Sequence, residues 1–128
     1  MTSGAPDAST EVVDLLTFAR RGAASTAWAY GGAQLNANLL VFEKGEGVAT
    51  HVNNAVDVLL VGIAGQGVIT VDGQEHHVCA GQALVMAKGT RRAIRAVGGR
   101  FSYLTCHQRR PGLWPEGVPR PEANPETP

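Results

Sequence analysis

The side chains best suited to chemistry fall at strand spacing in the middle of the chain. His51 and Asn53 are two residues apart, so on a β-strand both point to the same side. An imidazole can serve as a general acid or base at neutral pH, and a neighbouring amide can orient the ring or bind a ligand. We therefore expect His51, the candidate catalytic residue, and Asn53 to face a common interior cavity.

Arg92 adds a fixed positive charge to this set. Alternation from Gly89 places Arg92, Ile94 and Ala96 on one side of a strand. A guanidinium among apolar side chains can hold a carboxylate, an enolate or a phosphate. Because an unpaired charge there would be costly, we expect Asp57, a bound anion or water to neutralise it. The alternatives are that Arg92 swings outward or forms a structural ion pair with Asp57.

Tyr103 completes the predicted site. Phe101 and Thr105 share its side of the last predicted strand, so its hydroxyl can reach the same interior. The predicted ligand-binding residues are therefore His51, Asn53, Arg92, Tyr103 and Asp57.

We expect the other histidines to have structural and not catalytic positions. His76 and His77 are adjacent, so on a strand they point to opposite sides and cannot both line one cavity. One of them, together with His107 or Cys106, could instead build a separate site. Most isolated histidines of this kind are surface residues or hydrogen-bonded core residues.

Short apolar runs between glycine-marked turns must position these residues. Such runs predict a sandwich or barrel of β-strands. Asp72-Gly73 is a strong hairpin signal because both residues accept a positive φ. The predicted strands are Thr26–Tyr30, Leu35–Glu43, Val56–Ile63, Val68–Val71, Gln74–Cys79, Ala83–Ala87, Arg92–Val97 and Arg100–His107.

The ends of the chain differ from this core. Residues 1–22 form an N-terminal segment in which Thr10 can cap a short helix or turn and Gly22 can end it. Residues 23–108 form the predicted barrel domain. Residues 109–128 hold six of the seven prolines, which predicts an extended or disordered tail. Trp114 is the one residue there suited to docking on the barrel or on a partner.

Composition narrows the function. The chain has 128 residues, 44% of them hydrophobic, which suits one domain with a core. Its 11 basic residues balance its 11 acidic ones, so neither nucleic acid nor an anionic membrane is an expected partner. No signal peptide or membrane span is visible, and two cysteines make no disulfide framework. We expect a cytoplasmic protein with free thiols.

The spacing of the glycines resembles the two motifs of the cupin family. Gly45 precedes His51 by six positions and Gly65 closes the first motif; Gly81 and Gly89 frame the second. Glycines at such offsets reflect turns that need a positive φ. The resemblance covers about residues 35–107 and implies an all-β, antiparallel jelly-roll barrel with a central cavity.

The metal-ligand positions of the two motifs are mostly lost. The second histidine position holds Asn53, the glutamate position holds Val58 (or Asp57 at the shorter spacing), and the second motif's histidine is Arg92. Asn binds transition metals weakly, Val cannot bind them, and a guanidinium would repel a divalent ion. We therefore expect no cofactor and no metal; a divalent ion, if bound, would be held by His51 with Asn53 or Asp57.

These observations predict a small-molecule partner. The first hypothesis is a metal-free barrel that binds a small anionic or polar organic ligand. The second is an enzyme, either a metal-independent isomerase, cyclase or epimerase that uses His51 or, with less support, a metal-dependent dioxygenase. The third is a structural or regulatory dimer with a filled cavity. Apolar residues on both sides of Leu39–Phe42, together with Trp28–Tyr30, predict a homodimer.

Overall fold

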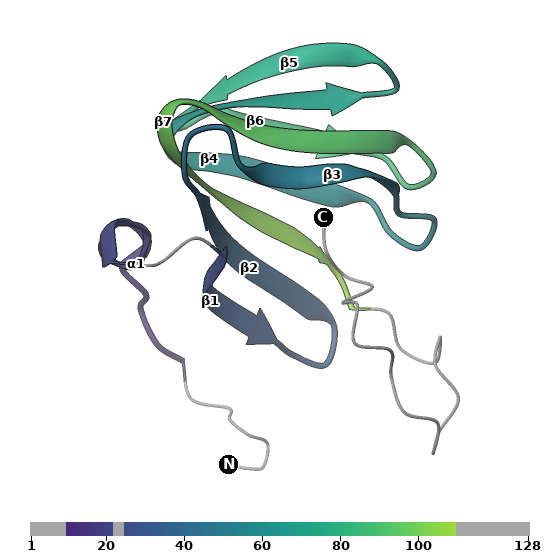
Figure 1. The fold of residues 1–128 in the computed structure, drawn as a ribbon. Helices are drawn as coiled ribbons and strands as arrows, with labels where there is room; N and C mark the ends of the chain where they lie inside the picture. The colour runs from purple at the N-terminus through teal and green to yellow at the C-terminus, as the bar shows by residue number, and fades with distance from the viewer. Residues whose placement is uncertain (1–9, 22–24, 110–128) are drawn as a thin grey trace.

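The structure is a computed structural model that describes residues 10–21 and 25–109 (Figure 1). The predicted tail and Trp114 therefore lie outside the described residues. The described part has one short helix and an antiparallel sheet of seven strands. The elements are α1 (Leu15–Arg21), β1 (Ser25–Gly31), β2 (Leu35–Phe42), β3 (Gly47–Val52), β4 (Val58–Val71), β5 (Gln74–Cys79), β6 (Ala83–Met86) and β7 (Arg91–Gln108).

Two long strands, β4 and β7, hold the sheet together. The second half of β7 pairs with β2 and with the first half of β4, while its first half pairs with β3 and with the second half of β4. The edges are completed by β1 on β2 and by β5 and β6 on β4. Each long strand thus belongs to both ends of the sheet, and the sheet curls around a common interior (Figure 1).

The predicted division of these long strands was wrong. The sequence predicted two strands within residues 56–71 and two within residues 92–107, but each pair is one continuous element. The glycines bend the strands without ending them. The pairing of β4 with β7 shifts register on both sides of Ala64, next to Gly65 with φ 80°, and β7 carries positive φ at Gly98 and Gly99. Such irregularities increase bend and twist locally.

The interior of the barrel is mainly apolar. Alternate residues of the facing strands meet there, as strand geometry requires. The buried cluster consists of Leu40, Val56, Val58, Leu60, Ile69, Val78, Met86, Ile94, Ala96, Phe101 and Tyr103. The ring of Tyr103 lies 5.2 Å from that of Phe101 and 6.2 Å from that of Phe42, centroid to centroid. These contacts fix the direction of the phenol.

The helix α1 begins later than predicted, at Leu15. Asp14, and not Thr10, is its capping residue, because its carboxylate accepts hydrogen bonds from the backbone N–H and the hydroxyl of Thr17. These bonds lower the pKa of Asp14, as expected for an acid at a helix N-terminus.

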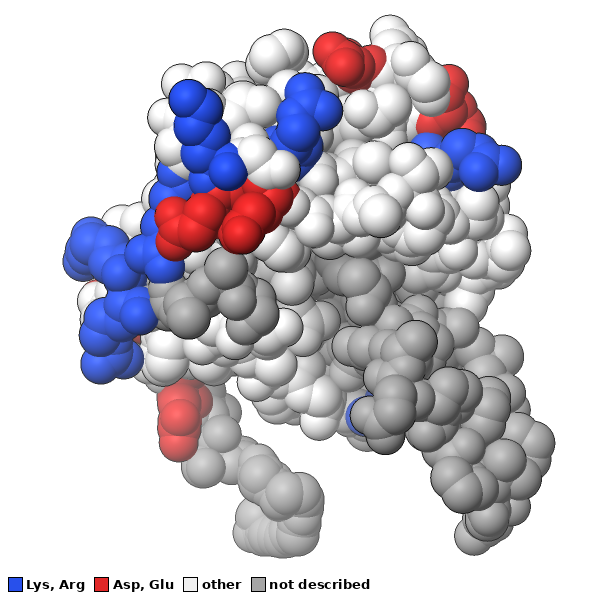
Figure 2. All heavy atoms as spheres, viewed as in Figure 1, with Lys and Arg blue, Asp and Glu red and all other residues white. Residues whose placement is uncertain are grey.

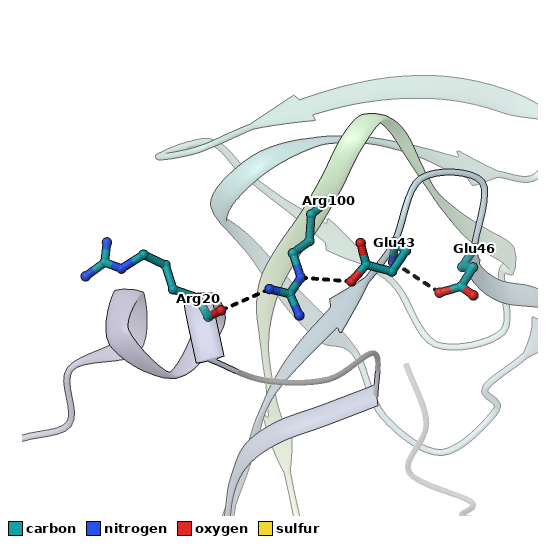
Figure 3. Close-up of polar contacts among 4 residues, drawn as sticks. All are labelled: Arg20, Glu43, Glu46 and Arg100. Carbon is teal, nitrogen blue, oxygen red and sulfur yellow. Dashed lines mark hydrogen bonds and ion pairs between the residues drawn. The ribbon is translucent and has the colours of Figure 1, made fainter.

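Arg100 ties the end of α1 to the barrel. Its Nη1 donates to the carbonyl oxygen of Arg20 at 3.0 Å, and its Nε lies 3.2 Å from Oε2 of Glu43 (Figure 3). The backbone N–H of Glu43 in turn donates to Oε1 of Glu46. Figure 2 shows basic side chains gathered on the side that carries α1, with acidic side chains directly beside them. This side of the molecule therefore presents mixed charge.

The outer side of β2 is apolar, as predicted, but α1 of the same chain covers part of it. Leu39 and Val41 point outward, yet neither has exposed surface, and α1 packs against β1, β2 and β4. Beside this covered part lies a row of five residues, each of which is the cross-strand partner of the next. We call it the outer apolar row. Its members are Tyr30, Ala37, Cys106, Leu59 and Val85.

The outer apolar row is partly open. Tyr30 is 52% exposed, Leu59 39% and Val85 61%. The predicted dimer therefore has less free apolar surface on β2 than the sequence suggested, but it has this row. No helix in the described part of the chain is long and apolar enough to cross a membrane.

Candidate functional site

Arg92 lies inside the barrel, as the alternation predicted. It has no exposed surface, and Ile94 and Ala96 are buried on the same side of β7, whereas Arg91 and Arg95 are exposed. The guanidinium turns back to the loop before its own strand. Its Nε donates to the carbonyl oxygen of Thr90 at 3.1 Å. Its Nη2 donates to the carbonyl oxygen of Ala87 at 2.8 Å and to the hydroxyl of Thr90 at 2.9 Å.

The charge of Arg92 has no direct counter-charge in the described part of the chain. Its Nη1 is buried and without a hydrogen-bond partner there, and no carboxylate among those residues forms an ion pair with it. Burial lowers the pKa of Arg92, while Asp72 and then Asp57 act in the opposite direction. The group still carries its proton at neutral pH because a guanidinium ordinarily deprotonates only above about pH 12. Two N–H donors on Nη1 are left for another molecule.

His51 stands beside Arg92. The two residues are cross-strand partners in the β3–β7 pairing, so their side chains share the inner side of the barrel. Nδ1 of His51 lies 3.0 Å from the carbonyl oxygen of Ala49. Since a carbonyl only accepts, Nδ1 carries the proton of the neutral ring and Nε2 is the free base. Nε2 is buried and has no partner among the described groups, while the residue as a whole is partly exposed.

Asn53 follows directly after β3 and is buried. Its Oδ1 accepts hydrogen bonds from the backbone N–H groups of Ala55 and Val56, at 2.9 and 3.2 Å. These bonds fix the orientation of the amide. Its Nδ2 then remains as a buried donor without a partner in the described structure. The backbone carbonyl of Asn53 accepts from Gly89, which joins this residue to the loop that holds Arg92.

Asp57 is not part of this interior group. It is exposed, and its Oδ1 accepts a hydrogen bond of 2.8 Å from the backbone N–H of Lys88. Tyr103, by contrast, is fully buried, and its hydroxyl has no partner in the described part of the chain. Burial raises the pKa of Tyr103, so its phenol stays protonated. The structure thus places four of the five predicted residues inside the barrel and one at its surface.

Two further interior polar residues were missed. Thr105 and His107 follow Tyr103 on the inner side of β7, and both are buried. Oγ1 of Thr105 and Nε2 of His107 have no partner among the described residues. Alternation along the predicted strand already places Thr105 on the same side as Tyr103, and the same alternation extends to His107. The neighbours of His107 became apparent only from the pairing of β7 with β2 and β4. His76 is partly exposed and His77 exposed, whereas His107 is buried.

The residues at the metal-ligand positions of the two motifs do not fit a divalent metal ion. Asn53 directs an NH₂ group and no lone pair into the interior, because its oxygen is already bonded to backbone. Asp57 lies at the surface, Val58 is apolar, and Arg92 brings a positive charge. Only Nε2 of His51 remains as a ligand atom, whereas protein metal sites use three or four. The described residues also contain no group of three or more His, Cys, Asp or Glu placed to hold an ion.

Comparison with known proteins agrees with this architecture. No protein-family model and no curated protein matches the chain. The solved structure of BH2720 from Bacillus halodurans superposes with a TM-score of 0.72 at 19% identity, over 88% of this chain and 89% of that one. The cupin protein BF4112 from Bacteroides fragilis superposes with a TM-score of 0.56 at 24% identity, over 69% and 80% of the two chains.

A third similar structure is a cupin superfamily protein, DSY2733 from Desulfitobacterium hafniense DCB-2. Its TM-score is 0.56 at 25% identity, over 62% of this chain and 71% of that one. The chain therefore has the fold of the cupin superfamily, an antiparallel β jelly-roll barrel.

Proposed function

We propose that this barrel binds a small, anionic or polar organic molecule without a metal, and that Arg92 is the anchor for the anionic group. One observation carries the proposal. The guanidinium is fully buried and held by three hydrogen bonds through Nε and Nη2, while both donors of Nη1 are unused by the described residues. The side chain is thus oriented in advance for a contact that the described residues do not supply.

The burial of the Arg92 guanidinium favours an anionic ligand. A buried guanidinium without a counter-charge costs several kcal/mol in desolvation, and Asp57 and Asp72 act on it only from a distance. A carboxylate or phosphate on Nη1 would supply the missing negative charge in apolar surroundings, where the attraction is strong. Asn53 Nδ2 is a second unused donor, on a residue bonded to the same loop. Two donors of this kind match the oxygens of one anionic group.

Access to the group requires movement. Arg92 and Tyr103 have no exposed surface, whereas His51 is partly exposed. A ligand that approaches past His51 must displace packed side chains before it reaches Nη1. The positions of the polar groups that it would meet are set by backbone hydrogen bonds at His51, Asn53 and Arg92. We therefore place the required movement in the apolar neighbours.

The geometry of His51 favours an enzyme as the second candidate. With Nδ1 bonded to Ala49, the free Nε2 can remove a proton from a ligand bound at Arg92, as a metal-independent isomerase, cyclase or epimerase requires. The Arg92 guanidinium, bonded to the ligand's carboxylate, would also stabilise the negative charge that moves onto the carboxylate oxygens as the adjacent carbon loses its proton. The dioxygenase has less support, because among the metal-ligand positions of the two motifs only His51 keeps a metal-binding side chain at the expected spacing.

The test compares two arginines of one strand. Arg92→Met removes the proposed anchor, and Arg95→Met removes an exposed charge on the other side of β7. Binding of a panel of small carboxylates and phosphate is measured by calorimetry on the full chain. We expect Arg92→Met to weaken binding by about 2–5 kcal/mol, as for other truncated buried charges, and Arg95→Met to leave it unchanged. Equal affinity in the wild type and in a folded Arg92→Met variant would refute the anchor.

A further inference from the structure

Three successive inward side chains on the second half of β7 carry unused polar atoms. Tyr103 and Thr105 have no exposed surface and His107 is 3% exposed. The hydroxyl of Tyr103, Oγ1 of Thr105 and Nε2 of His107 have no partner among the described residues. We call these three residues the β7 polar row. Inward residues on one strand are ~6.7 Å apart, so the row is ~13 Å long.

Without a ligand, the unpaired polar groups of the β7 polar row destabilise the folded protein. A buried donor or acceptor left without a partner destabilises the folded state, and most buried polar groups in native proteins are paired. Apart from Arg100, which pairs with Glu43, the unpartnered buried polar side-chain atoms in residues 10–21 and 25–109 all belong to the barrel interior. They divide between the β7 polar row and the group of His51, Asn53 and Arg92. Their concentration on one inner surface indicates a function for the row.

The two groups lie close together in the barrel. Leu59 pairs with Cys106, so the residues before and after them, Val58 and His107, are neighbours by the same register. Val58 pairs in turn with Met86. Two strand spacings, ~10 Å, thus separate His107 from Met86. The next residue, Ala87, accepts the hydrogen bond from Nη2 of Arg92. A single small molecule bound in the interior can therefore contact both groups at once.

The chemistry of the row is that of hydroxyl recognition. The hydroxyls of Tyr103 and Thr105 can each donate and accept. Nδ1 of His107 lies 3.0 Å from the carbonyl oxygen of Gln108, so in the neutral ring Nε2 accepts. The ring of Tyr103 is held in place by the stacked ring of Phe42 and the tilted ring of Phe101. Alcohol groups, which donate and accept, match all three members, whereas a second charged group would be left without a counter-charge.

We propose that the ligand is a hydroxylated carboxylic acid, with its carboxylate on Arg92 and its hydroxyl groups on the β7 polar row. This inference rests on the proposed function and specifies its ligand class. An apolar acid of the same length would satisfy Arg92 but leave the row unpaired. Sites built to bond a hydroxyl discriminate strongly against analogues without it. The β7 polar row therefore selects ligands that carry hydroxyl groups, and Arg92 selects ligands that carry a negative charge.

Two six-carbon acids serve as probes, gluconate with hydroxyl groups and hexanoate without them. Their affinities for the full-length wild type, Thr105→Val and Tyr103→Phe are measured by calorimetry. We expect the wild type to bind gluconate more tightly than hexanoate. Each variant, which loses one hydrogen bond to an alcohol, should bind gluconate about 5- to 20-fold more weakly. Neither should lose affinity for hexanoate, because the hydroxyls that they remove do not contact it.

The result separates this inference from the proposed function. Equal affinity of the wild type for the two acids, or a gluconate-to-hexanoate ratio unchanged in both variants, would overturn the role of the row. If Arg92→Met still abolished binding of both acids in that case, the anion site would stand. If neither acid bound to the wild type and other carboxylates did not bind either, both proposals would fail.

Discussion

Replacing Thr105 by valine should stabilise the ligand-free protein. Thr105 is fully buried, and its hydroxyl has no partner among the described residues. Valine has nearly the same shape, so the substitution removes the unpaired hydroxyl without opening a cavity. An unpaired buried polar group costs about 1–3 kcal/mol, and we expect the free energy of unfolding to rise by roughly that amount. Because the cost is present only in the folded state, the gain should appear as slower or less frequent unfolding.

The measurement is urea denaturation followed by circular dichroism, with a thermal scan beside it. For a domain of about 100 residues, each kcal/mol shifts Tm by roughly 4 °C or more. Thr50→Val is the matched control, because Thr50 is exposed on β3 and reports only the higher strand preference of valine. Its expected effect is within about 0.5 kcal/mol. A Thr105→Val protein that is less stable than the wild type, or no more stabilised than the control, would show that the hydroxyl is paired in the folded state.

Three other predictions follow from the fold and the site. Protein purified without chelator should contain well under one equivalent of iron, zinc, manganese or nickel by elemental analysis; a stoichiometric metal on His51 would contradict this. The chain should form a homodimer through the outer apolar row, since exposed apolar surface favours association; a monomer mass by light scattering at tens of micromolar would count against it. Gly65→Ala should destabilise the fold by more than about 2 kcal/mol, because a Cβ there would overlap the backbone carbonyl oxygen of Arg100. Gly45→Ala, with a similar φ but no atom within 4 Å of the added Cβ, should cost less, and equal losses in urea denaturation would refute the steric argument.

Local patterns were sufficient for much of this protein. Alternation along a strand is a property of the backbone, so the inward direction of Arg92 and Tyr103 could be read from neighbouring residues. The glycine frame likewise predicted the fold, since Gly45, Gly65 and Gly89 do adopt a positive φ. Gly65, and also Gly98 and Gly99 on β7, misled the division into strands, because they lie within continuous strands. A glycine with positive φ is compatible with both a turn and a bulge, and only pairing with a neighbouring strand distinguishes the two.

The tertiary structure decided which polar groups are paired and which are not. Asp57 seemed able to neutralise Arg92, but the backbone N–H of Lys88, 31 residues away, holds it at the surface. Alternation from Tyr103 already pointed His107 inward, but the residues that surround it were decided by the register of β7 with β2 and β4. Such pairings join segments far apart in the chain, so no local period reports them. The amino-acid sequence by itself determined the barrel and the direction of its inward side chains, whereas the vacant hydrogen bonds that define the candidate site arise only when distant strands meet.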